Sequence, residues 1–141
     1  MSAPKTIALI AHDGKKAELL DFANEHRAFL ERFQLIATGT TGRLLGALGI
    51  KVKPYLSGPI GGDAQIAADV ATGACHAVIF FRDPLGNHPH DPDISMLMRI
   101  CDVHNVPLAT NPATAELIVK ADSFDERREP QIPSTLPDLG E

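Results

Sequence analysis

The sequence has few cysteines and few aromatic residues, and it lacks any long apolar run. Its 141 residues include two cysteines, one tyrosine and no tryptophan. Cys75 and Cys101 show no CxxC or zinc-type spacing, so we expect two buried, reduced thiols rather than a disulfide framework or a zinc site. No apolar run approaches the roughly 20 residues of a membrane helix, so the sequence predicts no transmembrane segment.

Positive charge is also scarce, with 13 Lys and Arg against 18 Asp and Glu and a net charge of −5. This balance argues against a nucleic-acid-binding protein, because such proteins depend on basic surfaces. Six of the acids and two arginines fall in residues 121–141, which leaves residues 1–120 at only −1. That part can still hold a basic pocket for an anion. Residues 1–5 show no signal-peptide pattern, so we expect a cytoplasmic protein.

What the sequence does contain is a regular alternation of strand-like and helix-like segments. The predicted strands are residues 6–11, 34–38, 52–56, 77–81 and 106–110, and the predicted helices are residues 15–33, 41–49, 63–72, 92–104 and 112–120. This order predicts an α/β protein, a single-domain three-layer αβα sandwich with a mainly parallel central sheet of Rossmann-like or flavodoxin-like type. We expect that domain over residues 1–120, followed by a loosely ordered, acidic, Pro-containing tail over residues 121–141.

Ligands bind such sheets at the carboxyl ends of the strands, so the loops there are the candidate sites. Residues 38–42, TGTTG, combine two glycines with three threonines at the start of a helix. Converging backbone N–H groups, hydroxyl donors and the helix dipole suit a phosphate or another small oxyanion. The alternative is a tight turn with a threonine N-cap. Lys16 is either the matching cation or a solvated helix lysine.

A second glycine-rich loop, SGPIGGD at residues 57–63, also ends at a helix start. Its backbone amides are placed to surround the other side of the same anion. Asp63 has two interpretations that its position alone leaves open. It is either an N-cap or first-turn acid favoured by the helix dipole, or a functional carboxylate held at a cleft between strand ends.

The segment RDPLGNHPHDPD, residues 82–93, contains three acids and two histidines. We expect Asp91 to cap a helix that starts at Pro92, with Asp93 in the first turn facing the cleft. A metal site is the alternative, because His88, His90, Asp91 and Asp93 are all ligand types. No HxxxH or HExxH spacing supports it.

The remaining histidines divide by position. His12 directly follows the first predicted strand and adds a titratable group to the same edge of the sheet, whereas His26, His76 and His104 are predicted to be structural or surface residues. The sequence has neither GxGxxG nor GxxxxGK[ST], so it predicts no dinucleotide or P-loop nucleotide site.

Taken together, these loops resemble the methylglyoxal synthase family. The matching stretches are IALIAHDGKK, ATGTTG, SGPIGGD, FFRDPL, PHDPD and PLATNPAT, in the family's order, between about residues 6 and 119. The resemblance implies conversion of dihydroxyacetone phosphate to methylglyoxal and inorganic phosphate, without a metal or an organic cofactor. It also implies a cytosolic homohexamer that phosphate inhibits. No nucleic-acid or membrane partner is implied.

The resemblance further implies roles for individual residues. Asp63 corresponds to the catalytic base, His90 to a neutral donor to the enediolate oxygen, Asp93 to a second essential carboxylate and Asp83 to a supporting one. His12 corresponds to a substrate-binding residue. The expected phosphate-binding residues are Lys16, Thr38, Thr40, Thr41, Ser57 and Gly58.

The same fold also serves as a regulatory ligand-binding domain in carbamoyl phosphate synthetase. A non-catalytic module that senses a phosphorylated metabolite is therefore the alternative function. Such a module needs the anion site but not the acids, so the presence of Asp63, His90 and Asp93 together favours the enzyme. Arg127 and Arg128 are the only basic residues of the tail, and we assign neither a role.

Overall fold

The computed structural model describes residues 4–86 and 91–121. Five strands form one parallel sheet in the order β3-β2-β1-β4-β5. They are β1 (Thr6–Ala11), β2 (Gln34–Ala37), β3 (Lys53–Pro54), β4 (Ala77–Phe81) and β5 (Leu108–Ala109). The central strand β1 pairs through Ile7 with Leu35 on one side and Ala77 on the other. This is the Rossmann strand order, in which β2 and β3 follow on one side of β1, and β4 and β5 on the other. The change of side leaves a crevice between the carboxyl ends of β1 and β4, where such sheets bind ligands.

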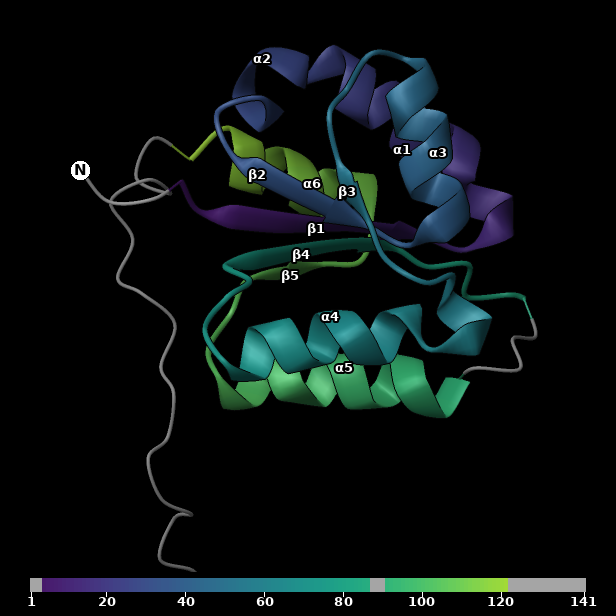
Figure 1. The fold of residues 1–141 in the computed structure, drawn as a ribbon, viewed down its shortest axis with the longest axis vertical. Helices are drawn as coiled ribbons and strands as arrows, with labels where there is room; N and C mark the ends of the chain where they lie inside the picture. Colours follow the sequence, from purple (N-terminus) through teal and green to yellow (C-terminus); the bar gives the residue numbers. More distant parts are fainter. Residues whose placement is uncertain (1–3, 87–90, 122–141) are drawn as a thin grey trace, which may run out of the picture.

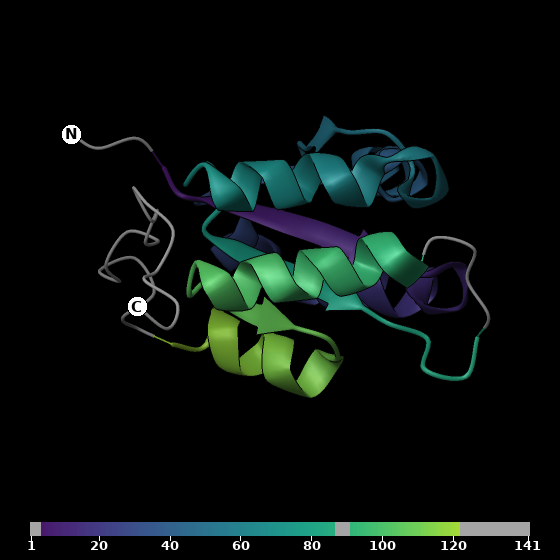
Figure 2. The same cartoon turned by 90° about the horizontal axis from the view of Figure 1, so that it is seen from below.

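The helices cover both faces of the sheet and confirm the predicted αβα sandwich. They are α1 (Lys16–Glu25), α2 (Arg27–Leu30), α3 (Gly39–Ala47), α4 (Gly62–Ala71), α5 (Asp91–Val103) and α6 (Pro112–Val119), with 3-10 turns η1 (Asp13–Lys15) and η2 (Gly58–Ile60). Helices α1, α2, α3 and α6 lie on one face, and α4 and α5 on the other (Figure 1). Figure 2 shows α4 and α5 side by side across that second face.

The two apolar cores follow from the alternation of side chains along a strand. Strands β1 and β4 are buried along their whole length. Leu9 and Phe81 face the layer of α1, α3 and α6, whereas Ile10 and Phe80 face α4 and α5. Because both faces of these strands are buried, their sequences read as continuous apolar runs rather than as alternating ones.

The prediction of one helix over residues 15–33 is wrong. The segment consists of η1, α1 and α2, and it breaks at His26, whose φ and ψ are −106° and 26°. Leu19, Phe22 and Leu30 nevertheless pack into the same core cluster. The apolar spacing therefore continues across the break, which is why the periodicity did not reveal it.

Two predicted strands are shorter than expected. The segment at residues 52–56 narrows to Lys53–Pro54, and that at 106–110 narrows to Leu108–Ala109. Both lie at sheet edges, and Pro54 lacks the N–H that a ladder bond requires. Helix α5 starts at Asp91, one residue before the predicted start. The side chain of Asp91 lies outside the described residues, so its capping role stays a prediction.

None of the helices in the described ranges combines the length and apolar character needed to cross a bilayer. Residues 122–141 lie outside the described residues, so the acidic tail remains a sequence prediction.

Candidate active site

A cavity of about 420 Å³ lies at the carboxyl ends of β1, β2 and β4. It is lined by Ile10, Ala11, His12, Asp13, Lys16, Thr38, Thr40, Thr41, Ser57, Gly58, Pro59, Asp63 and Phe80. This is the crevice at which the strand order reverses, where sheets of this type bind their ligands. All the predicted phosphate-binding residues, together with His12 and Asp63, therefore come to one place.

The TGTTG loop forms one wall of this cavity at the start of α3. Thr38 occupies the N-cap position with an extended backbone, but its side chain makes no capping hydrogen bond. Thr41 is 1% exposed, and its hydroxyl has no hydrogen-bond partner among the described residues. Both observations support the anion-binding interpretation, because hydroxyl groups that make no hydrogen bond within the protein can bind a ligand.

Glycines allow the second wall, the loop before α4, to approach the first. A Cβ on Gly39 would lie 3.3 Å from the backbone nitrogen of Ser57. A Cβ on Gly62 would lie only 1.9 Å from the carbonyl oxygen of Leu56. Gly61 precedes it with φ of 111°, a conformation that favours glycine. The glycines in both motifs thus serve the close packing of two loops around one cavity.

Asp63 lies in the first turn of α4 at the cavity wall, and its side chain is fully buried. A carboxylate in the first turn is stabilised by the positive end of the helix dipole. Burial of a charge is otherwise costly, so a buried acid on the wall of a polar cavity is a candidate for chemistry rather than for helix capping. The N-cap position belongs to Gly61, so Asp63 is not the N-cap residue, and its first-turn position agrees with both the helix-dipole interpretation and the functional one.

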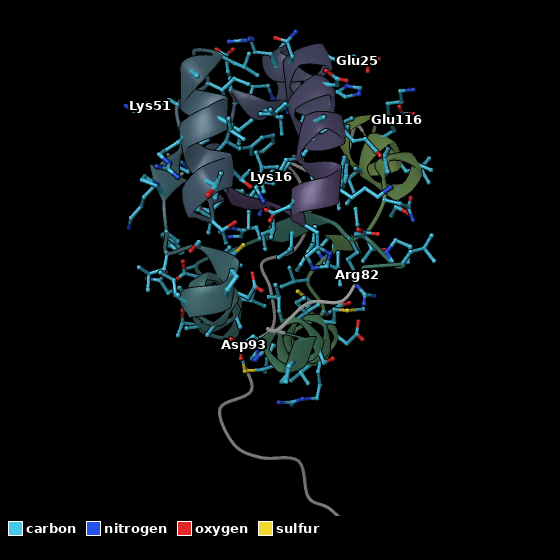
Figure 3. All side chains as sticks on the ribbon, turned by 90° about the vertical axis from the view of Figure 1, so that its right-hand side faces the viewer. Lys16, Glu25, Lys51, Arg82, Asp93 and Glu116 are labelled. Atoms are coloured by element: carbon cyan, nitrogen blue, oxygen red, sulfur yellow. The ribbon has the colours of Figure 1, made fainter. Side chains whose placement is uncertain are left out.

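Lys16 is the cation of the cavity and the first residue of α1. Its Nζ donates to the Ala11 carbonyl oxygen at 3.0 Å and to Asp13 Oδ1 at 2.7 Å. Figure 3 faces the carboxyl edge of the sheet, with Lys16 between α1 and α3 and Asp93 at the start of α5 in the opposite layer. An anion entering the cavity competes with Asp13 for this ammonium group.

His12 is 5% exposed and is held in one orientation. Its Nδ1 accepts a hydrogen bond of 2.8 Å from the backbone N–H of Asp83, and its ring packs edge-on against Phe80 at 5.1 Å. A neutral imidazole whose Nδ1 accepts carries its proton on Nε2. The hydrogen-bond network therefore assigns His12 as an N–H donor at the cavity wall.

The other predicted acids are not part of the described lining. The Asp83 carboxylate accepts a bond of 3.2 Å from the Leu85 N–H within its own loop. Asp93 is half-buried in the first turn of α5. His88 and His90 lie outside the described residues, so neither the predicted role of His90 nor the metal alternative for residues 88–93 is tested.

Asp13 and Pro59 also line the cavity, although neither was predicted to be a site residue. The available signal for Asp13 was its spacing of three residues from Lys16 in a tight turn. For Pro59 the signal was its place inside SGPIGGD. The lining residues Ile10, Ala11 and Phe80 are ends of buried strands, and the apolar pattern alone marks them only as core.

One group of possible metal ligands occurs in the described part of the chain, and it lies outside this cavity. Donor atoms of Glu25, His26 and Glu116 lie within 4.8 Å of one another, where the last residue of α1 meets α6. Glu116 also pairs with Lys120 at 3.9 Å. Lys16 and the cavity are at the opposite end of α1.

Both cysteines are buried and unpaired, as predicted. Burial raises the pKa of the Cys75 thiol and that of the Cys101 thiol to about 12 each. Neither thiol lines the cavity, so neither is a candidate nucleophile.

The sequence of this chain is similar to those of known proteins. A family model described as an MGS-like domain matches residues 18–110. The methylglyoxal synthase of Borrelia garinii is 57% identical over 117 residues, 82% of this chain and 93% of that protein. The methylglyoxal synthase of Carboxydothermus hydrogenoformans is 57% identical over 116 residues, 82% of this chain and 96% of that protein.

A solved structure is similar over nearly the whole chain. The crystal structure of methylglyoxal synthase from Elizabethkingia anophelis superposes with a TM-score of 0.85 at 42% identity, and the match covers 93% of this chain and 87% of that one. Sequence identity above half and a shared fold over most of both chains lead to one conclusion: the chain belongs to the methylglyoxal synthase family.

Proposed function

We propose that the protein is a methylglyoxal synthase, a carbon–oxygen lyase that converts dihydroxyacetone phosphate to methylglyoxal and inorganic phosphate. The observation that carries the proposal is the fully buried Asp63 carboxylate in a cavity that also holds an ammonium group, threonine hydroxyls and backbone amides. Proton abstraction from a phosphorylated ketone requires a general base next to a site that binds the phosphate.

Binding of the substrate phosphate is assigned to the two loops and Lys16. Thr38, Thr40 and Thr41 supply hydroxyls at the start of α3, and Ser57 and Gly58 face them from the neighbouring loop. The N-terminal end of α3 adds partial positive charge from the helix dipole. His12 donates through Nε2 to a substrate oxygen.

The chemistry begins at the hydroxymethyl carbon next to the ketone, where Asp63 removes a proton. The C–H electron pair forms the enediolate, whose oxygen accepts a hydrogen bond from neutral His90, as the family resemblance implies. One preorganised donor of this kind is commonly worth about 3–4 kcal/mol. Asp93 and Asp83 are the second and the supporting carboxylate.

Elimination follows when the enediolate electrons break the bond between the adjacent carbon and the phosphate oxygen. Phosphate leaves with that electron pair, and the hydroxyl proton of the former hydroxymethyl carbon is released as this carbon becomes the aldehyde. The remaining enolate then gains a proton at its methylene carbon to become methylglyoxal. The breaking bond must overlap the enediolate π system, so the phosphate has to be held out of its plane. We assign this orientation to the TGTTG and SGPIGG loops.

The decisive experiment is an assay of methylglyoxal formation from dihydroxyacetone phosphate with EDTA present, beside the Asp63→Asn variant. Activity of the native protein that EDTA leaves unchanged and that the variant loses supports a metal-free lyase dependent on Asp63. Phosphate binding without turnover by the native protein supports the sensing module instead. Loss of activity with EDTA supports the metal-dependent alternative.

We also propose that the protein acts in the cytoplasm as a homohexamer, as the resemblance implies. Exposed apolar side chains such as Leu48, Ile60 and Leu117 offer surface that subunit contacts would cover. Light scattering coupled to gel filtration tests the subunit number, and a mass of one or two chains would exclude the hexamer.

A further inference from the structure

The loop at residues 55–61 contributes Ser57, Gly58 and Pro59 to the cavity lining. Only the first residue of this loop is hydrogen-bonded to the sheet. Strand β3 has two residues, and the Tyr55 N–H extends the pairing by one bond to the Ala37 carbonyl oxygen at 2.7 Å. The side chains of Leu56 and Ile60 are 48% and 66% exposed. Apolar packing therefore anchors the loop only at Tyr55, whose side chain packs against the core cluster of α4 and α5, and the position of the residues that follow depends on hydrogen bonds.

The backbone of Leu56 is the point at which these hydrogen bonds converge. Its N–H donates to Gln65 Oε1 at 2.7 Å, and its carbonyl oxygen accepts from the Gly39 N–H at 3.3 Å. The next carbonyl, that of Ser57, accepts from the Gly62 N–H at 3.0 Å. Residues 56 and 57 are thus bonded to the first turns of both α3 and α4.

The Gln65 contact is reinforced one turn further along α4. The Tyr55 hydroxyl donates to Asp69 Oδ2, and Gln65 and Asp69 are four residues apart, on the same face of the helix. Two neighbouring side chains of α4 therefore hold two consecutive residues of the loop. The carboxylate of Asp63 projects from the first turn of this same helix.

From this arrangement we infer that Gln65 is a positioning residue, which fixes the phosphate-binding atoms of Ser57 and Gly58 relative to Asp63. Gln65 does not line the described cavity and acts only through the Leu56 N–H. The inference rests on the proposed function, because it takes this cavity to be the phosphate site.

The effect belongs to binding rather than to stability. The Gln65–Leu56 hydrogen bond is exposed, so water can satisfy the Leu56 N–H when the glutamine is removed. Water cannot restore the position of the loop, and catalytic and binding groups are sensitive to displacements of about 1 Å.

The test compares Gln65→Met, which keeps the length of the side chain but removes the acceptor, with Gln65→Glu, which keeps an acceptor oxygen. At about 0.15 M salt the Debye length is about 8 Å, so the added charge beside the phosphate-binding loop is screened only in part. For Gln65→Met we expect the Kd of inorganic phosphate and the KM to rise roughly three- to tenfold. We expect kcat to stay within about twofold, as for lost uniform binding.

Gln65→Glu is expected to restore the hydrogen-exchange protection of the Leu56 amide and to recover part of the phosphate affinity and KM that Gln65→Met loses. Unchanged phosphate affinity in Gln65→Met would overturn the inference, and so would a Gln65→Glu variant as impaired as Gln65→Met. If the native protein binds phosphate but forms no methylglyoxal, the proposed function fails. A weaker phosphate affinity in Gln65→Met would still support the positioning role.

Discussion

His12 accepts a hydrogen bond through Nδ1 from the backbone N–H of Asp83 at 2.8 Å, which joins the loop after β1 to the loop after β4. The bond spans 71 positions in the sequence, and in a neutral ring it places the proton on Nε2, in a residue that lines the cavity. A single side chain thus both fixes a loop and presents a donor, and substitutions can separate these two tasks.

We predict that His12→Asn separates them. The Asn carbonyl oxygen can replace Nδ1 as acceptor for Asp83, whereas the Nε2 donor is lost. A hydrogen bond to a charged partner contributes about 1.5–3 kcal/mol, so kcat/KM should fall roughly 10- to 100-fold with little change in Tm. His12→Phe removes both groups and should also lower Tm. A kcat/KM for His12→Asn close to that of the native protein would exclude a role for Nε2 as a donor.

Thr41→Val is expected to stabilise the protein and weaken ligand binding at the same time. A buried hydroxyl without a partner costs about 1–3 kcal/mol, so valine should raise the free energy of unfolding by about 1 kcal/mol. Phosphate affinity should fall roughly tenfold if this hydroxyl binds the anion. Urea unfolding and phosphate calorimetry measure the two effects. Thr72→Val, remote from the cavity, is the control for binding.

Gly62→Ala should disrupt the site through a backbone clash. Its Cβ would lie 1.9 Å from the Leu56 carbonyl oxygen, and neither backbone can move without displacing residues 56–62. We expect the free energy of unfolding to fall by about 1–3 kcal/mol or more, and the activity to be lost. Gly46→Ala in α3 is the matched control, because nothing lies within 4 Å of that Cβ. It should stabilise the helix by about 0.5–1 kcal/mol. Similar Tm changes for both variants would contradict the tight approach.

Stability should fall at alkaline pH through the buried thiols. Burial raises the pKa of Cys75 from 9.0 to about 12, so above pH 9 the thiol ionises in the unfolded chain but not in the folded one. Between pH 9 and 12 this group alone should lower the free energy of unfolding by about 1.4 kcal/mol per pH unit. Below pH 9 it contributes no pH dependence.

Urea titrations of Cys75→Ala from pH 8 to 11 check this expectation. The variant is less stable at pH 8 because it leaves a small cavity, but its stability should decline less steeply with pH. Equal slopes for the variant and the native protein would show that the thiol is solvated rather than buried.

Much of the fold could be predicted from the sequence. The predicted strands β1 and β4 are continuous apolar runs, as expected for parallel strands that are buried on both faces. Their buried residues include Ile7, Leu9, Ile79 and Phe81. Local periodicity did not predict the break at His26, and it overestimated the strand around Pro54. Both outcomes depend on packing and on sheet-edge position, which a local pattern does not contain.

For the site, the sequence alone determined which residue types are present and at which strand ends they would lie. TGTTG and SGPIGGD could be identified because glycine, hydroxyl and acid types follow directly after apolar runs. Only the tertiary structure decided that Asp63 is fully buried, that His12 Nδ1 accepts from the Asp83 N–H and that Gln65 accepts from the Leu56 N–H. Burial and hydrogen-bond partners are properties of distant segments brought together, so no residue's neighbours in the chain could specify them.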